Sequence, residues 1–464
     1  MRLRPPASAA ARPHAFREVR DSMLHSISFR PLPGLAVFAL VTGALVHAAA
    51  ANEPPAAIAG GRTGPLFAAD STLDLAAFER AVLARNPSYA AMTAAAREAT
   101  AHADVEGSLE DPMVDLGLAP NSFGAANVDV GWRASVSQVL PLFGQRGLKR
   151  QVAAADADAA LGDAETARLD LVRAARIAFY DDYHEERARA TALELLEWMR
   201  RSRASALSRY AAGTAEQQDV LAADVEIAML DHQAVRAERN RLLVEARIRA
   251  LLHVDPLAPL PAPPDTLPLP DRDEARLLVM RSNERARPEL RAALAAEESQ
   301  RARLALARRE RLPEPRLGAG YDRTMTEREY RFQVALSFNA PLSLGRHAAA
   351  QREAQAGIDV ATARVDATRD ALSRQITAAS VDFEESLHEL EVLRDTLLPA
   401  TERALASSRS RYESGHGDFD TIIRAVRDVL NARLEYHRTL ASVNQAHAEL
   451  ERALGGPNLK ESAR

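Results

Sequence analysis

The sequence contains no cysteine and few aromatic residues. The lack of cysteine excludes disulfide bonds, thiolate metal ligands, a cysteine nucleophile and a lipid anchor on an N-terminal cysteine. Aromatic residues make up only 5% of the chain, although hydrophobic residues make up 47%. Alanine supplies much of that hydrophobic content. A sequence rich in alanine and charge but poor in aromatics is typical of long helices in narrow contact, not of one thick globular core.

Charge and motif content also exclude several function classes. The formal net charge of -5 on 464 residues does not provide the basic face that a nucleic-acid-binding protein needs. There is no nucleophile elbow, P-loop or complete dinucleotide fingerprint, and the twelve histidines form no HExxH motif or tight cluster. Only His416 merits a test of metal binding. We therefore predict no enzymatic activity, no cofactor and no metal site.

Long hydrophobic runs are scarce too. The run from Leu35 to Val46 follows Arg30 and precedes the small residues Ala48 to Ala51, and it is too short to cross a bilayer as a helix. This arrangement predicts a signal peptide over residues 1–51, with Met23 as a possible true start. The alternative is a buried core helix.

The sequence then repeats itself at a spacing of roughly 200 residues, which indicates a duplicated structural unit. We expect an extended segment over 52–71, a first repeat over 72–254, a proline-rich linker over 255–271, a second repeat over 272–455 and a tail over 456–464. The residues that match between the two copies are Pro87 and Pro288, Pro141 and Pro341, Gly144 and Gly345, Tyr210 and Tyr412, and Gly213 and Gly415.

The helices are predicted from the positions of glycine and proline. A break is expected at Asn86-Pro87, and one long helix is expected from Gly144 to Gly213 with a weak point at Gly162. Thr214 is expected to cap the returning helix. In the second copy, Pro399 should bend the equivalent long helix.

Each copy also contains two extended runs, at about 112–139 and 316–339, in which apolar and polar residues alternate. A two-residue alternation predicts a strand with one apolar side. The apolar side either faces lipid in an outer membrane or packs in a soluble sheet. The residues that we predict to face lipid are Val130, Trp132, Tyr330, Phe332, Val334 and Leu336.

Four strands in one chain cannot close a barrel, and an open sheet in lipid leaves unpaired backbone groups at a cost of several kcal/mol each. The chain must then share a barrel with identical copies. Two copies give eight strands around a filled interior, and three give twelve strands around a usable lumen. Heptad-like spacing, as at Leu390, Leu393 and Leu397, fits either a solid rod or a ring of helices around a channel, and the linked strands favour the ring.

These features resemble the outer-membrane efflux proteins of the TolC family. The resemblance covers about Leu73 to Gly455, and it rests on the order of the P-L-x-x-G junctions, the two R-Y-x-x-G turns and the Leu398-Pro399 step. It implies a mainly α-helical chain in which long periplasmic hairpins join four strands of a trimeric twelve-strand barrel. It also implies a periplasmic adaptor, an inner-membrane pump and outer-membrane lipid as partners. The sequences from Phe143 to Gly147 and from Gln217 to Leu221 look most like those of the family branch that serves heavy-metal pumps.

The resemblance places the entrance of the channel at the hairpin ends. Asp219, Asp418 and Asp420 are candidate gate residues, while Arg424 stands where the family commonly has an aspartate. We therefore hypothesise an Arg–Asp latch between neighbouring hairpins. The alternative is that these acids only favour helix starts. Candidate adaptor-docking residues are Arg209, Tyr210, Gly213, Arg411, Tyr412 and Gly415. The favoured alternative for the tyrosines and arginines is that they only pack the hairpins.

The predicted function is a passive conduit for small solutes or metal ions from periplasm to exterior, in a tripartite efflux system with an iris-like gate. Two alternatives stay open at this point. One is a duct for type I protein secretion, and the other is a periplasmic coiled-coil scaffold or adaptor. The scaffold leaves the apolar strand faces unexplained.

Overall fold

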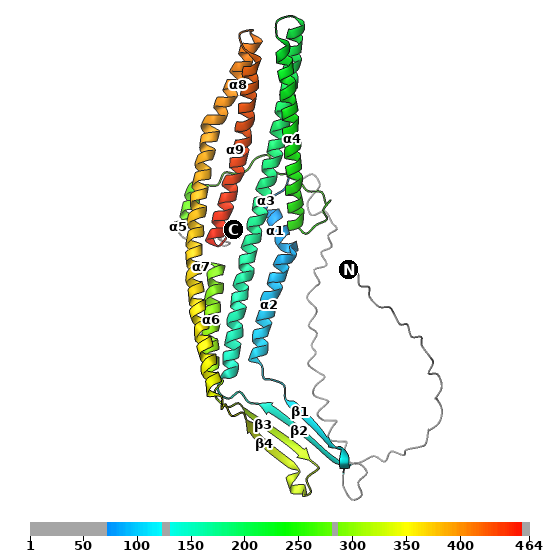
Figure 1. Cartoon of the computed structure of the whole chain (residues 1–464), viewed down its shortest axis with the longest axis vertical. Helices are drawn as coiled ribbons and strands as arrows, with labels where there is room; N and C mark the ends of the chain where they lie inside the picture. Colours follow the sequence, from blue (N-terminus) through cyan, green and yellow to red (C-terminus); the bar gives the residue numbers. More distant parts are fainter. Residues whose placement is uncertain (1–71, 123–129, 281–285, 457–464) are drawn as a thin grey trace, which may run out of the picture. The chain divides into compact units, whose positions relative to one another are not determined.

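The computed structural model of the chain describes residues 72–122, 130–280 and 286–456 (Figure 1). The predicted signal peptide and the segment 52–71 lie outside the described residues. Helices dominate, and a single four-stranded sheet lies at one end of the helices. In the described part of the chain, no helix has an apolar stretch long enough to cross a bilayer.

The first repeat opens with two helices, α1 (Leu75–Arg85) and α2 (Pro87–Gly107). Asn86 separates them, because its side chain accepts hydrogen bonds from the backbone N–H groups of Ser88 and Tyr89 and so caps α2. Pro87 takes the first helical position, where its missing N–H costs nothing. The predicted break at Asn86-Pro87 is confirmed.

The long helix α3 runs from Gln145 to Ala211 without interruption. Its 67 residues extend over about 100 Å. The predicted weak point at Gly162 is wrong. A Cβ at Gly162 would lie 2.8 Å from the Cβ of Ala292 and 2.9 Å from the carbonyl oxygen of Pro288, both in α6 (Pro288–Arg309). Glycine is needed here for close helix packing, and the surrounding good helix formers keep α3 continuous.

Helix α3 turns back into α4 (Gln217–Leu251). The predicted cap at Thr214 is wrong: Glu216 occupies the N-cap position, and the Thr214 hydroxyl donates to the carbonyl oxygen of Arg209 at 3.1 Å. The proline-rich linker follows, and it joins the start of the first repeat through a hydrogen bond from Leu73 N–H to the carbonyl of Ala262.

The second repeat follows the same order. A short helix α5 (Arg272–Met280) precedes α6, and the second long hairpin comprises α7 (Leu344–Val392), α8 (Leu398–Glu413) and α9 (Phe419–Leu454). A π-helical turn, η4 (Leu393–Leu397), separates α7 from α8.

Pro399 explains the position of that π-helical turn. Proline lacks a backbone N–H, and its ring clashes with the carbonyl group four residues earlier, at Asp395 within η4. The helix relieves this conflict by widening over one turn. The structure thus places a π-helical turn next to Pro399, and the predicted bend of the helix stays a prediction.

The strands of both repeats form one antiparallel sheet in the order β1-β2-β3-β4, comprising β1 (Met113–Ala119), β2 (Gly131–Val139), β3 (Pro315–Asp322) and β4 (Phe332–Phe338) (Figure 1). A short 3-10 helix, η1 (Pro120–Ser122), follows β1.

The second strand of the second repeat begins later than predicted. Tyr330 belongs to a second short 3-10 helix, η3 (Arg328–Tyr330), in which its N–H donates to the carbonyl of Glu327 at 3.2 Å. The prediction that Tyr330 lies in a strand is therefore wrong. Turn hydrogen bonding replaces the ladder at this point.

The helices bury several local cores. One apolar cluster joins α1, α3, α7 and α9 to the linker and includes Phe78, Tyr183, Phe383, Leu390 and Leu450. A separate cluster lies at the ends of the two long hairpins. Alanine supplies many of the other buried positions, which lets helix axes approach closely.

Candidate functional site

The sheet carries one continuous apolar face. Residues directly opposite each other in a ladder share a face. The register therefore brings together Val114, Leu116, Leu118, Trp132, Ala134, Val136, Leu317, Ala319, Tyr321, Phe332, Val334 and Leu336. No described element covers this face: Leu116 is 69% exposed and Leu336 is 66% exposed. Trp132 and Tyr321 contact each other on it, with ring centroids 5.4 Å apart.

The opposite face is polar and small. Asp115, Ser135, Gly320 and Gln333 lie opposite one another across all four strands. Gly320 has no room for a side chain, because a Cβ there would lie 2.8 Å from the Cβ of Ser135. A sheet with these two faces has one side for an apolar environment and one for water.

The two edge strands of the sheet can each pair with a strand of another copy. Strands β1 and β4 each have one ladder partner within the described chain, and the alternating antiparallel order makes them run in opposite directions. The edge of one copy can therefore add antiparallel to the edge of the next. A head-to-tail contact of this kind gives a ring when the rotation between copies closes.

At the other end of the helices lie the two predicted hairpin turns. Gly213 and Gly415 adopt φ angles of 72° and 78°, a left-handed conformation that favours glycine. Each glycine N–H donates to a tyrosine carbonyl three residues earlier, from Gly213 to Tyr210 at 2.9 Å and from Gly415 to Tyr412 at 3.0 Å. The two copies therefore turn in the same way.

The two turns differ in what their tyrosines contact. Tyr412 is only 6% exposed, and its hydroxyl donates to Asp219 Oδ2 at 3.0 Å. Arg209 lies over the Tyr412 ring, with the guanidinium carbon 4.4 Å from the centroid, and donates to the Tyr412 carbonyl. Burial, assisted by the hydrogen bond to Asp219, raises the pKa of Tyr412 to about 12. We call this set the Tyr412 clasp; it joins the hairpin of one repeat to that of the other.

An apolar cluster and an ion pair with a buried carboxylate support the clasp. Phe419 packs against Tyr412, with ring centroids 5.2 Å apart. Glu226 of α4 is 2% exposed and accepts from Arg427 of α9 at 2.8 Å. We did not predict this pair. Its signal in the sequence is a carboxylate that lies between the apolar positions Ala223 and Leu230 on one helix face.

Other predicted gate residues do not meet within the chain. The Asp418 side chain accepts from the N–H of Asp420 and caps α9, as the helix-start interpretation expects. Arg424 is exposed and forms no hydrogen bond or ion pair with another residue that the structure describes. A latch between Arg424 and an aspartate of a neighbouring copy stays a prediction. Tyr210, at 44% exposed, and the exposed Arg411 lie outside the clasp.

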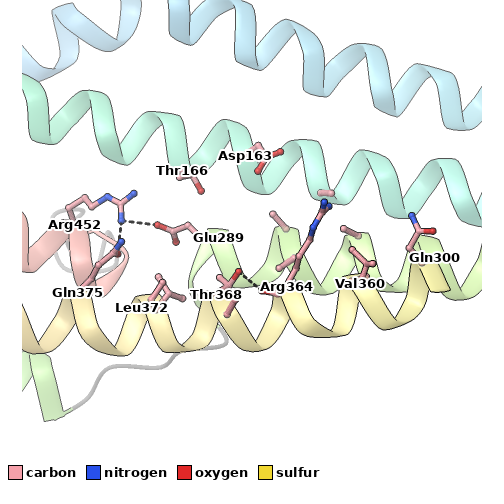
Figure 2. A pocket seen from close by; sticks show the side chains of 18 residues that line it. Asp163, Thr166, Glu289, Gln300, Val360, Arg364, Thr368, Leu372, Gln375 and Arg452 are labelled. Carbon is pink, nitrogen blue, oxygen red and sulfur yellow. Dashed lines mark hydrogen bonds and ion pairs between the residues drawn. The ribbon is translucent and has the colours of Figure 1, made fainter. Parts of the chain in front are cut away.

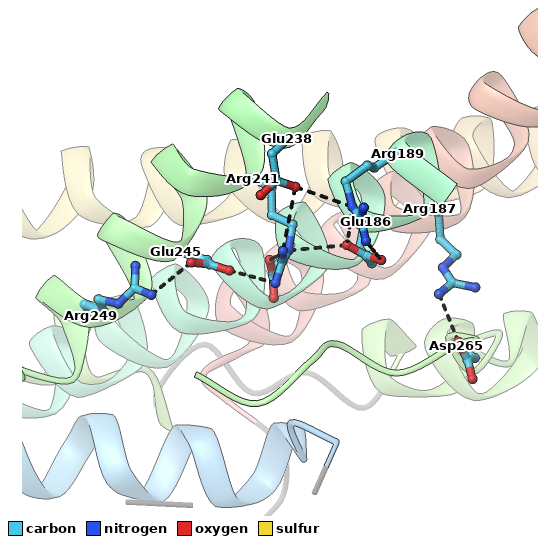
Figure 3. Close-up of polar contacts among 9 residues, drawn as sticks. Glu186, Arg187, Arg189, Glu238, Arg241, Glu245, Arg249 and Asp265 are labelled. Atoms are coloured by element: carbon cyan, nitrogen blue, oxygen red, sulfur yellow. Dashed lines mark hydrogen bonds and ion pairs between the residues drawn. The ribbon is translucent and has the colours of Figure 1, made fainter. Parts of the chain in front are cut away.

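A network of charged side chains joins α3 to α4 (Figure 3). Arg241 lies within ion-pair distance of Asp182, Glu186 and Glu245, at 3.8, 3.4 and 2.7 Å. Asp182 is 2% exposed, and its Oδ1 accepts no hydrogen bond. Burial, which Arg241 only partly offsets, raises the pKa of Asp182 to about 7.

A groove runs between α3, α6 and α7 and ends at Arg452 of α9 (Figure 2). Its volume is about 760 Å³ and alanine supplies much of its wall. Arg452 closes the end by contacting Glu289 at 3.0 Å and Gln375 at 3.3 Å. Within the described ranges, no group of three histidine or acidic side chains is arranged to hold a metal ion.

Comparisons with known proteins agree with this architecture. Residues 281–456 match the family model for outer membrane efflux proteins. The structure is similar to the outer-membrane channel OprN, with a TM-score of 0.67 and 22% identity over 82% of this chain and 90% of that one. It is also similar to the outer membrane protein VceC from Vibrio cholerae, with a TM-score of 0.69 and 17% identity over 82% of this chain and 96% of that one.

A third solved structure, that of CusC, gives a TM-score of 0.69 and 14% identity over 87% of this chain and 97% of that chain. A search of curated proteins by sequence found no match. Residues 281–456 thus match the outer membrane efflux protein family, and the chain has the fold of the outer-membrane channels.

Proposed function

We propose that this chain is the outer-membrane channel of an export system, and that three copies form one continuous passage. The observation that carries the proposal is the sheet. Its apolar face is exposed over all four strands, and its two edges run in opposite directions. In lipid, every backbone N–H and C=O group must be paired, so the edges have to meet in a closed barrel.

The number of copies follows from the need for an open lumen in the barrel. Three copies supply twelve strands, which enclose a polar interior, whereas eight strands leave a barrel filled by side chains. The face that would line this interior includes Arg133, Ser135 and Gln333. The long hairpins would extend the passage into the periplasm, after the signal peptide directs export of the chain.

The hairpin ends would form the entrance. The Tyr412 clasp holds the second hairpin against the first within each copy, and the apolar cluster beneath it excludes water. Opening requires these hairpins to separate, and the π-helical turn η4 lies where α8 can change direction relative to α7. The exposed residues Tyr210, Arg411 and Arg424 are then available to neighbouring copies or to an adaptor.

The partners would be a periplasmic adaptor and an inner-membrane pump that supplies the energy. We propose small solutes or metal ions as cargo; a duct for secreted proteins would use the same scaffold. The periplasmic scaffold alternative is disfavoured, because a water-soluble helical protein has no use for an exposed apolar sheet face.

The test is membrane flotation of the mature protein with vesicles, followed by gel mobility before and after heating. The proposal predicts that the protein floats and runs as a trimer until it is boiled. Protein that stays in the aqueous fraction without detergent would refute it.

A further inference from the structure

A second pocket lies where the helices meet the sheet, next to the end of α2, the start of α3 and the beginning of β1. We call it the junction pocket; its volume is about 330 Å³, within the range of small-molecule sites. Its position is fixed by local hydrogen bonds. The Gln138 side chain donates to the Glu110 carbonyl at 2.6 Å, and the buried Gln145 donates to the Arg309 carbonyl at 3.1 Å.

Charges of both signs line the junction pocket. Glu106, Glu110, Asp111 and Glu314 supply carboxylates, while Arg146 and Lys149 supply cations from the first turns of α3. Glu106 lies 3.9 Å from His102, and the other five side chains form no hydrogen bond or ion pair with another residue in the described ranges. Opposite charges that line one pocket without pairing leave room for a ligand that carries both charges.

The surroundings of the pocket are apolar and exposed. Val105 and Leu109 line it, and Leu142 and Phe143 follow β2 just before α3; all four side chains are exposed. The pocket lies where β1 begins and β2 ends, so it adjoins the helix-side limit of the apolar sheet face. In the proposed channel, this limit is the boundary between lipid and periplasm, where headgroups lie.

The geometry points to the junction pocket as a site for the headgroup of a zwitterionic phospholipid, of the phosphoethanolamine type. Arg146 and Lys149 bind its phosphate, and Glu110, Asp111 and Glu314 bind its ammonium group. No side chain caps the start of α3, so its first N–H groups also favour the phosphate. The acyl chains then lie along Leu109, Leu142 and Phe143. This inference rests on the proposed function, because it places the junction at a membrane surface.

The experiment measures lipid binding to the intact mature protein by native mass spectrometry, after exchange into detergent that contains phosphatidylethanolamine or phosphatidylglycerol. We expect preferential retention of phosphatidylethanolamine. The double variant Arg146→Gln/Lys149→Gln should retain it about a hundredfold more weakly, because the loss of each charged hydrogen bond corresponds to about a tenfold step. The matched control is Arg346→Gln, an exposed arginine at the equivalent junction of the second repeat. It should bind lipid as the wild type does.

Three results would overturn the assignment. Equal retention of phosphatidylglycerol would show that the carboxylates bind no ammonium group. Displacement of the lipid by inorganic phosphate as readily as by soluble phosphoethanolamine would show a simple anion site. Weakened trimers with unchanged lipid retention in the double variant would show that a neighbouring copy covers the pocket. Failure of the wild type to float with vesicles would instead refute the proposed function, so the two failures are distinguishable.

Discussion

The Tyr412 clasp gives the sharpest prediction about gating. The substitution Tyr412→Phe keeps the ring under Arg209 and in contact with Phe419, and it removes only the hydroxyl that donates to Asp219. A hydrogen bond to a charged partner contributes about 1.5–3 kcal/mol when buried. Because Asp219 is only half-buried, we expect about 1 kcal/mol per clasp, or roughly fivefold in the opening equilibrium of each hairpin.

The assay is single-channel recording in planar bilayers, in which Tyr412→Phe should raise the open probability. Tyr210→Phe is the matched control, since Tyr210 holds the equivalent position in the first repeat but is exposed and lies outside the clasp. The raised pKa of Tyr412, about 12, also predicts that this effect is constant from pH 6 to pH 9, about three units or more below titration. If both phenylalanine variants conduct like the wild type, the clasp does not hold the entrance closed.

Three further predictions concern folding and membrane insertion. Asp182→Asn should flatten the pH dependence of the free energy of unfolding. In the folded wild type the pKa of Asp182, about 7, lies above that of an unfolded aspartate, so the wild type loses stability as pH rises from about 4 to 7. Urea titrations of both proteins at pH 5 and pH 8 measure the difference. Gly162→Ala should destabilise the chain by about 1–3 kcal/mol, because the added Cβ clashes with α6. Gly147→Ala should stabilise it slightly, because a Cβ at Gly147 meets no atom within 4 Å. Thermal melts compare the two variants, and equal melting temperatures would contradict the packing role of Gly162. Val334→Arg should lower recovery in the membrane fraction, at a cost of about 2–4 kcal/mol if lipid covers the middle of that side, while Gln333→Arg on the opposite face should not; similar recovery of both variants would argue against a lipid-facing side.

Much of the fold was predictable because it rests on local rules. The helix break at Asn86-Pro87 and the left-handed turns at the two hairpin glycines follow from the backbone preferences of those residue types, and the structure contains both features. The alternation of apolar and polar residues identified the strands for the same reason. Periodicity alone did not place the start of the last strand, where turn hydrogen bonds hold Tyr330 in a 3-10 helix.

The errors come from contacts between distant segments. Gly162 reads as a helix breaker in isolation, but its role depends on Ala292, 130 positions further along the chain. The clasp was missed for a related reason. Asp219 was predicted as a gate residue, but the sequence did not indicate that its hydrogen-bond partner is Tyr412, in the other repeat. The duplication suggested that Tyr210 and Tyr412 are equivalent, and packing between the repeats makes them different.

The central claim is that the sheet edges of one copy are completed by other copies. Since the chain has no cysteine, Asp115→Cys on β1 and Gln333→Cys on β4 introduce its only thiols. Treatment of membranes with flexible bismaleimides should then link neighbouring copies and give dimers and trimers, with nothing larger. Protein that stays monomeric with every linker length, or a ladder that continues past the trimer, would contradict the account.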